Sequence, residues 1–281
     1  MAADAGFFSP PQIAEKVVGV AEAKSKLPIL KMIILGIFAG VYIGFGAELA
    51  TMVTNDTAGF LGVGVAKFLG GSVFAVGLML VVIGGSELFT GNNLIMVGVL
   101  RGKVHWLNGL LRNWFWVYLA NFVGSLLLVW FMYGSQLWAV NGGAVGLKAI
   151  DIANAKCNLA FWAAFCRGIG CNWLVCLAVW LAIGAKTVVG KVWGIWFPIM
   201  AFVASGFEHC VANMYFIPMG LFLKGNADFL SMVGKTAADY ANLTWGNFLL
   251  DNLLPVTLGN IVGGSFFVAA LYWLVYLRGK E

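Results

Sequence analysis

The chain has 281 residues, of which 61% are apolar and only 10% are charged. Because soluble domains carry about 25% charged residues, a water-soluble fold cannot hide this much apolar surface, and the sequence predicts an integral membrane protein. The net charge of +5 calls for no nucleic-acid partner, since membrane proteins concentrate Lys and Arg in cytoplasmic loops. Five cysteines in no C-x-x-C spacing indicate neither a disulfide framework nor a metal site.

The N-terminal segment, residues 1–28, carries a helix-start signal in which Ser9 caps a first turn that contains two prolines. Apolar residues then recur at helical spacing, on the face opposite a set of charged residues. We predict a short amphipathic helix on the cytoplasmic surface of the membrane, with a solvated arm as the alternative. The apolar positions are Ile13, Val17, Val20 and Ala21.

Residues 29–281 carry six apolar segments, each long enough to cross a bilayer core, which takes about 20 residues of helix. The first contains four glycines at a spacing that lets helices approach closely in lipid. The second and fifth are interrupted by polar, glycine-containing stretches at about 84–93 and 205–209. The predicted spans are 29–53, 60–100, 114–133, 159–183, 192–223 and 248–276, and the glycine-rich and asparagine-rich stretch up to Cys157 is expected to be a loop.

The positions of Lys and Arg between these spans predict the topology. Most of them fall on the side of the N-terminus, so we expect both termini in the cytoplasm and a location in the inner (cytoplasmic) membrane. Lys67 and Arg167 lie in or near spans and do not enter this comparison. The basic residues on the other side are Lys148, Lys156, Lys224 and Lys235.

Two motifs occur twice in the chain, in the same order. The first is G-x-E followed by an asparagine five residues after the glutamate, at Glu87 with Asn92 and at Glu208 with Asn213. The second is L-x-N-x-V-G, at residues 119–124 and 258–263. Spans one to three therefore repeat as spans four to six.

The repeats, at about 29–134 and 158–277, each contain three spans, so they must insert in opposite orientations. An inverted repeat with helices broken at corresponding places indicates a transport site near the membrane midplane. Backbone groups freed at the breaks need partners, which asparagine amides can supply. We therefore predict that five asparagines serve mainly as scaffold: Asn92, Asn121, Asn172, Asn213 and Asn260. Of these, Asn172 is also predicted to border the substrate pathway at the gate.

Glu208 and His209 are the ionisable pair near the middle of the fifth apolar segment. Such a pair at membrane depth costs at least a few kcal/mol per group unless it is partnered or wet. We predict a functional site, the alternative being a pair that only bonds neighbouring helices. A membrane haem subunit normally needs facing histidines, and the only other histidine is His105, in a cytoplasmic loop. No cofactor or metal is therefore predicted, and a membrane-embedded redox enzyme is the weaker alternative to a pore or carrier.

The surroundings of His209 indicate the substrate. Lys156 at the mouth of the fourth span attracts anions, broken-helix N-termini favour them, and His209 exchanges a proton near neutral pH. Large apolar residues would make dry constrictions, which a neutral acid crosses more easily than its anion. We predict a small monovalent anion of a weak acid, with constrictions at Phe74, Leu78, Leu88, Phe89 and Phe202.

Three segments, GSELFTGNN, ASGFEHCVANM and LPVTLGNIVGG, resemble the signature motifs of the formate/nitrite transporter family, and the resemblance covers about residues 10–279. It implies an aquaporin-like protomer, assembly as a homopentamer and one pore in each protomer. It implies a central gate of Thr90 and His209, a further constriction at Val175 and an anion-attracting role for Lys156. The segments YLRG and FVASGFEH are most similar to formate channels, so we expect formate as substrate, possible proton linkage through His209, and nitrite or hydrosulfide as alternatives.

Overall fold

The computed structural model describes residues 6–279, and within them every regular element is a helix apart from an isolated bridge between Phe7 and Ala185. Six helical segments are long and apolar enough to cross a membrane, which confirms the predicted all-α, multi-pass membrane fold. Residues 1–5 and 280–281, the outer ends of the predicted segments 1–28 and 29–281, lie outside the described residues.

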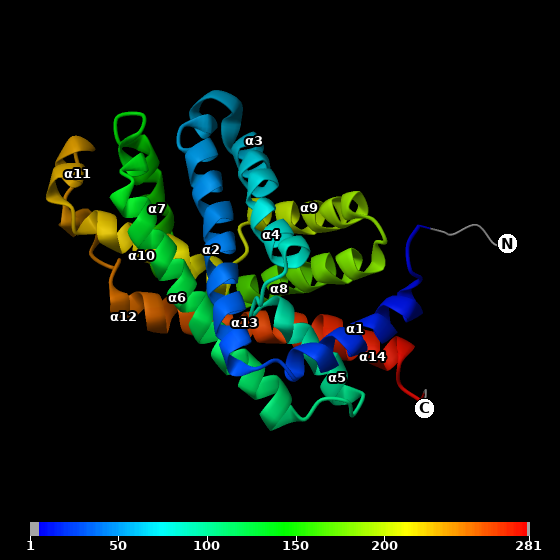
Figure 1. Cartoon of the computed structure of the whole chain (residues 1–281). Coiled ribbons are helices and arrows are strands. Elements are labelled where there is room, and N and C mark those ends of the chain that lie inside the picture. Colours follow the sequence, from blue (N-terminus) through cyan, green and yellow to red (C-terminus); the bar gives the residue numbers. More distant parts are fainter. Residues whose placement is uncertain (1–5, 280–281) are drawn as a thin grey trace.

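The first half of the chain contains the N-terminal helix and three spans, of which the second is interrupted (Figure 1). Helices α3 and α4 form the longer part of that span, and η1 with α5 forms the shorter part. The elements are α1 (Pro10–Ser25), α2 (Ile29–Thr54), α3 (Thr57–Phe74), α4 (Val76–Gly84), η1 (Gly91–Ile95), α5 (Met96–Leu100), η2 (Trp106–Leu111) and α6 (Arg112–Gly134).

The second half repeats this arrangement, with α9 and α10 as the two parts of the interrupted span. The third and sixth spans begin earlier in the chain than predicted. The elements are η3 (Leu137–Ala139), α7 (Ala144–Cys157), α8 (Phe161–Gly184), α9 (Val188–Ser205), α10 (Cys210–Lys224), α11 (Ala227–Met232), η4 (Ala237–Tyr240), α12 (Trp245–Asn247), η5 (Phe248–Leu253), α13 (Leu254–Ile261), η6 (Val262–Ala270) and α14 (Leu271–Tyr276).

Both interruptions begin at a glycine with a left-handed backbone. Gly85 ends α4 with a φ of 87°, and Gly206 ends α9 with a φ of 78°. Glycine adopts this conformation without the steric cost that a Cβ brings, so each helix stops there and the chain continues without helical hydrogen bonds. The breaks predicted at 84–93 and 205–209 are confirmed.

Small residues let corresponding helices pack closely in the two halves. Helix α2 lies against α6, and α8 lies against α13. A Cβ added at Gly40 would lie 2.8 Å from the backbone nitrogen of Ser125, and one added at Gly168 would lie 2.8 Å from the carbonyl oxygen of Val256. The backbones therefore approach as closely as the glycine spacing of the first span predicts.

Helix α7 corrects one prediction, because the stretch up to Cys157 that was expected to be a loop is helical over Ala144–Cys157. The glycines and asparagines near its start obscured the pattern. Val145, Ala149, Ile150 and Ala153 are buried at helical spacing, and this spacing was the available signal. The correction matters because α7 carries Lys148 and Lys156 and holds both in register on one rigid element.

The predicted N-terminal helix is confirmed over Pro10–Ser25, with Ser9 and Gln12 in a capping box. Its apolar face, however, is covered by the protein itself rather than left for the membrane surface. Ile13, Val17 and Ala21 are buried, and α1 contacts η1, α5, α8 and α14. The helix therefore belongs to the body of the molecule and lies beside the site described below.

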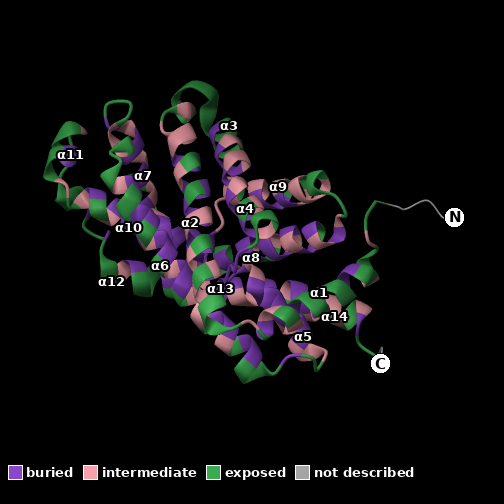
Figure 2. Cartoon of the chain, in the orientation of Figure 1, coloured by how far each residue is buried: buried purple, intermediate pink, exposed green. Residues whose placement is uncertain are grey.

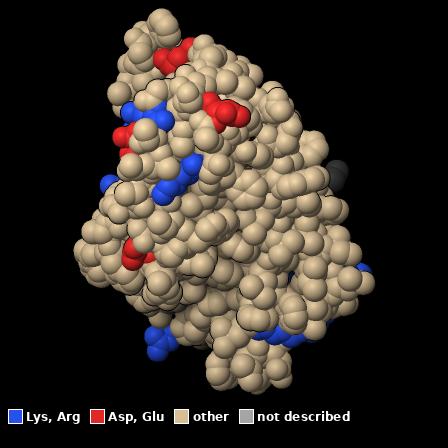
Figure 3. Space-filling model, turned by 90° about the vertical axis from the view of Figure 1, so that its left-hand side faces the viewer, with Lys and Arg blue, Asp and Glu red and all other residues tan. Residues whose placement is uncertain are grey.

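Much of the surface of the molecule is apolar, as expected for a surface in contact with lipid. Buried residues concentrate in the middle of the molecule, as Figure 2 shows. Figure 3 shows a face that is largely free of charged side chains across its centre. On α6, exposed apolar residues follow one another every four positions, which places them on one helix face: Phe115, Leu119, Val123 and Leu127. Such a face fits lipid or a neighbouring protomer.

We predict that Gly124→Ala destabilises the protein while Gly134→Ala in the same helix does not. A Cβ at Gly124 would lie 2.9 Å from the Cα of Ile37 on α2, whereas none of the surrounding atoms lies within 4 Å of a Cβ at Gly134. Overpacking typically costs about 1–3 kcal/mol. Thermal unfolding in mild detergent should show a lower Tm only for Gly124→Ala, and an unchanged Tm would contradict the close packing.

Candidate functional site

Thr90 and His209 face each other where the two interruptions meet. The distance between Thr90 Oγ1 and His209 Nε2 is 2.8 Å, and these residues are 0% and 3% exposed. Thr90 precedes η1, and His209 precedes α10. The first half and the second half of the repeat thus contribute one polar side chain each to a contact in the protein interior.

The hydrogen bonds of His209 define its tautomer. As the N-cap residue of α10, its Nδ1 accepts a hydrogen bond of 3.0 Å from the backbone N–H of Ala212. Nδ1 therefore carries no proton, and the neutral ring holds its proton on Nε2. Nε2–H then donates to Thr90 Oγ1, and the hydroxyl proton of Thr90 remains available to a further acceptor.

Glu208 is the centre of a polar cluster on one side of this contact. Lys156 Nζ lies 2.9 and 3.0 Å from its two carboxylate oxygens, and Asn213 donates to Glu208 Oε2 at 2.7 Å. Asn213 also donates to Asn252 Oδ1 at 2.7 Å, and Asn252 donates to the carbonyl of Lys156 at 3.0 Å. The buried carboxylate is thus both charge-paired and hydrogen-bonded, as burial requires.

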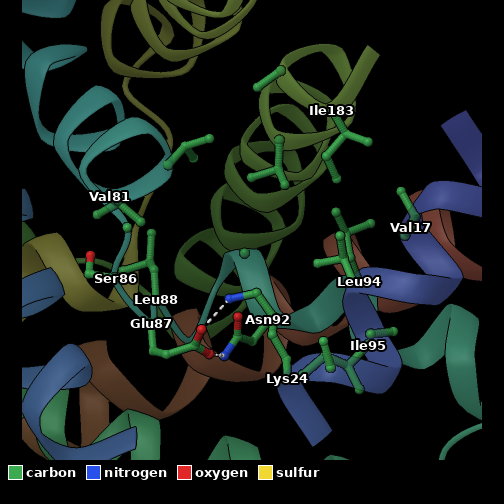
Figure 4. A pocket seen from close by; sticks show the side chains of 18 of the residues that line it. Val17, Lys24, Val81, Ser86, Glu87, Leu88, Asn92, Leu94, Ile95 and Ile183 are labelled. Carbon is green, nitrogen blue, oxygen red and sulfur yellow. Dashed lines mark hydrogen bonds and ion pairs between the residues drawn. The ribbon is translucent and has the colours of Figure 1, made fainter. Parts of the chain in front are cut away.

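Glu87 is the centre of a matching cluster on the other side (Figure 4). Lys24 Nζ lies 2.5 Å from Glu87 Oε1, and Asn92 donates to Glu87 Oε2 at 2.7 Å. Asn92 also donates to Asn113 Oδ1 at 2.8 Å, and Asn113 donates to the carbonyl of Lys24 at 3.3 Å. Each role in the Glu208 cluster has its counterpart here, so the inverted repeat extends to the side-chain chemistry.

Asn121 of α6 satisfies the backbone of the first interruption. Its Oδ1 accepts from the N–H of Phe89 at 2.9 Å. Its amide donates to the carbonyls of Glu87 at 2.9 Å and of Gly36 at 2.8 Å. One buried side chain therefore replaces helical hydrogen bonds on both sides of the break and ties the break to α2.

Asn260 of α13 does the same for the second interruption. Its Oδ1 accepts from the N–H of Cys210 at 2.9 Å, and its amide donates to the carbonyls of Glu208 at 2.9 Å and of Gly168 at 2.8 Å. Both asparagines are 0% exposed. The scaffold role predicted for these asparagines agrees with these contacts.

Asn172 connects the two halves at the level of the gate. The two hydrogens of its Nδ2 are shared among three acceptors, the carbonyl of Thr90 at 3.2 Å, Asn93 Oδ1 at 3.0 Å and the carbonyl of Asn260 at 2.7 Å. It therefore fixes the backbone that carries Thr90, while its predicted place on the substrate pathway stays a prediction.

Two cavities approach the contact between Thr90 and His209 from opposite sides. We call them the Glu87 vestibule, of about 480 Å³, and the Glu208 vestibule, of about 470 Å³. Leu78 and Leu88 line the Glu87 vestibule together with Lys24 and Glu87. The Glu208 vestibule is lined by Phe74, Lys156, Phe202, Glu208 and His209, among others.

Only some of the predicted constriction residues line a vestibule. The ring centroids of Phe74 and Phe202 are 5.6 Å apart, and that of Phe202 is 5.9 Å from His209. Phe89, by contrast, packs on α6, with its ring centroid 4.9 Å from that of Tyr118. Phe89 and Val175 are buried and line neither vestibule. The chain thus places apolar side chains on both sides of the gate, but not those two at the cavity walls.

Several polar residues of the site escaped prediction. The sequence marks Glu87 only as the repeat mate of Glu208, and that correspondence is the signal for a second cluster. Lys24 lies in the last turn of α1, as Lys156 lies in the last turn of α7, and both precede the repeats that the motifs define. Lys67 and Arg167 fall in or near apolar segments and carry no weight in the topology prediction, and both line the Glu208 vestibule. An ionisable residue in a span is itself a signal of function.

A family model described as Formate/nitrite transporter matches residues 11–274. The chain is 45% identical to a "Probable formate transporter" of Methanothermobacter thermautotrophicus, over 97% of this chain and 98% of that one. It is 40% identical to "Formate channel FocA" of Escherichia coli (strain K12), over 96% and 94% of the two chains. A solved "Pentameric formate channel with formate bound" superposes with a TM-score of 0.81 at 44% identity, covering 89% of this chain and 98% of that chain.

The Glu208 cluster generates a stability prediction. Lys156→Gln leaves the Glu208 carboxylate, whose side chain is 5% exposed, without its cation. Breaking a buried pair in this way costs about 3–5 kcal/mol. The double variant Lys156→Gln, Glu208→Gln removes both charges and should recover much of that loss. If the single variant unfolds at the same temperature as the double variant, the ion pair is not the reason for the burial of Glu208.

Proposed function

The chain belongs to the formate/nitrite transporter family, and we propose that it works as a homopentameric channel that passes formate across the membrane, one pore in each protomer. Membership of the family, relatives that are named as formate channels and transporters, and the likeness to a pentameric formate channel support this function. The observation in this chain that carries it is a polar contact between Thr90 and His209 with a vestibule on either side.

A carboxylate suits the groups at the gate. The hydroxyl proton of Thr90 is free to donate because Thr90 Oγ1 accepts from His209 Nε2 in the neutral tautomer. Beyond the gate, apolar side chains offer an anion no hydrogen-bond donors, so the free energy of moving it there from water is high. A small carboxylate that accepts one hydrogen bond from the Thr90 hydroxyl satisfies this free donor. Formate is the smallest carboxylate and fits this description.

His209 orients Thr90 in this proposal. The bond from the Ala212 N–H to Nδ1 holds the ring, and Nε2–H holds the Thr90 hydroxyl so that its proton points toward an arriving anion. Formate accepts this hydrogen bond as an anion, or as the neutral acid once it has taken a proton from hydronium of the bulk solution in the vestibule, a proton that it releases on the far side. Neutral formic acid then crosses the apolar segments at lower cost than the anion.

Proton-linked transport through His209 is the alternative. It requires the ring to break a hydrogen bond that it makes in the structure. A relay would take up a proton at Nδ1 and pass one on from Nε2 through Thr90 to formate. Uptake at Nδ1 requires the ring to release the Ala212 N–H, and the ring would finish as the tautomer with Nδ1–H. An anion beside the ring compensates the imidazolium charge and so favours the uptake step.

We further propose that the termini lie in the cytoplasm and that the protein is located in the inner (cytoplasmic) membrane. The excess of Lys and Arg on the side of α1, α5 and α14 supports this orientation. Figure 1 places α1 and α14 together, away from the turn between α2 and α3 and away from α11. The Glu87 vestibule then opens to the cytoplasm and the Glu208 vestibule to the opposite side. We propose no enzymatic activity for the chain.

Uptake into proteoliposomes tests the function. We expect formate to enter faster than acetate or lactate at two different external pH values, with nitrite and hydrosulfide as the competing candidates within the family. Protein-free liposomes provide the background. Faster uptake of nitrite or hydrosulfide than of formate would overturn the substrate assignment, and haem absorbance of the purified protein would instead support a redox subunit.

We predict that His209→Asn retains formate uptake at a rate within about ten-fold of the wild type, whereas Thr90→Val lowers it by more, since one charge-assisted hydrogen bond contributes about 1.5–3 kcal/mol. Asparagine can still cap α10 and donate a hydrogen bond but cannot titrate. Initial rates between pH 5 and pH 8 check this. His105→Asn, in the loop before η2, is the matched control because His105 also caps a helix start.

If His209→Asn abolishes uptake, or removes a pH dependence that the wild type has, the orienting role is wrong and the relay through His209 stands. His209→Phe, which keeps a ring but removes both hydrogen bonds, should disturb the gate in either case. It therefore serves to show that the assay responds to changes at this position.

A further inference from the structure

The Glu208 vestibule carries an unusual balance of charge. Four basic side chains line it, whereas Glu208 is its only acidic lining residue in the described part of the chain. The basic residues come from three elements, α3, α7 and α8, so they surround the cavity instead of following one helix face. They are Lys67, Lys148, Lys156 and Arg167.

Lys156 contributes little to the long-range field of this vestibule because Glu208 neutralises it. Its Nζ contacts both carboxylate oxygens, at 2.9 and 3.0 Å, and the side chains are only 14% and 5% exposed. A contact pair of opposite charges is a dipole, and its field falls off faster with distance than that of a single charge. Attraction of an anion from outside must therefore come from elsewhere.

The other three basic residues are not neutralised. No ion pair within residues 6–279 involves Lys67, Lys148 or Arg167. Lys67 and Arg167 are exposed, and Lys148 is half-buried. Lys148 lies on α7 about two turns, or about 12 Å, before Lys156, and the carbonyl of Arg167 accepts from the N–H of Glu208 at 3.2 Å. Lys148 thus lies nearer the start of α7 than the ion pair, Arg167 lies beside Glu208 at the backbone, and Lys67 lines the same cavity from α3.

We propose that Lys67, Lys148 and Arg167 form an outer anion-capture site that draws the transported anion into the Glu208 vestibule, while Lys156 acts only locally as the partner of Glu208. The identity of the anion as formate rests on the function proposed above. Three uncompensated charges at a low-dielectric wall raise the local concentration of small anions and their rate of arrival. This effect weakens as salt shortens the range of the field.

Uptake at low formate concentration tests the proposal because the rate then reflects capture. Arg167→Gln and Lys148→Gln should each lower uptake about two- to five-fold at low ionic strength, and the triple variant Lys67→Gln, Lys148→Gln, Arg167→Gln should lower it further. At high concentrations of an impermeant salt, the variants should approach the wild-type rate. A triple variant that keeps the wild-type rate at low salt would overturn the proposal.

Two controls separate the outer charges from other changes in charge. Lys235→Gln alters the net charge equally, outside the vestibule lining, and should leave the salt dependence unchanged. The double variant Lys156→Gln, Glu208→Gln removes the ion pair without changing the net charge of the cavity. Its remaining uptake should keep the wild-type salt dependence, and loss of that dependence would show that Lys156 carries the capture.

A second measurement needs no formate transport. Thr54 lines the Glu208 vestibule, and Thr54→Cys can be modified with an anionic and with a cationic methanethiosulfonate, using the parent protein as background for its own cysteines. The ratio of the anionic to the cationic rate should fall at least two-fold when the three basic residues are replaced by glutamine. An unchanged ratio would refute the capture site. A reduced ratio in a protein that does not transport formate would support the site and refute the proposed function.

Discussion

The structure depends on the need to satisfy backbone groups where two helices stop inside the membrane. Lipid offers no hydrogen bonds, so a broken helix survives there only if the protein supplies them. Asn121 and Asn260 each bind three backbone groups around a break. Because these amides hold both breaks at the same depth, Thr90 and His209 come within hydrogen-bond distance of each other.

The chemistry of the pore follows from that scaffold. Each break places a glutamate at its start, and each glutamate is charge-paired to a lysine from an element outside the breaks, Lys24 of α1 or Lys156 of α7. The pairs allow carboxylates to be buried beside a dry gate at limited cost. With the capture site proposed above, attraction of the anion falls to other basic residues, so that scaffold, gate and capture become separate tasks of separate side chains.

Much of this arrangement was predictable from the sequence because the same short motifs occur in both halves of the inverted repeat. The paired glutamates and asparagines indicated where the chain breaks, and hydropathy indicated the spans. Lys24 escaped the motif comparison because α1 and its counterpart α7, which each carry the pairing lysine in the last turn, lie just outside the repeats that the motifs define. The sequence predicts a loop where α7 lies because glycine and asparagine dominate the residues just before it. The ring of Phe89 turns toward Tyr118, which is a matter of rotamer and packing that no motif records.

The cap of α10 is proposed to keep His209 neutral, with its proton on Nε2, while formate is at the gate. Nitrogen-15 chemical shifts of the ring measure this directly, in a His105→Asn protein in which His209 is the only histidine left of the two. The account predicts one protonated nitrogen and one bare nitrogen, with the bare one hydrogen-bonded, both without and with formate. Two protonated ring nitrogens in the presence of formate would contradict it.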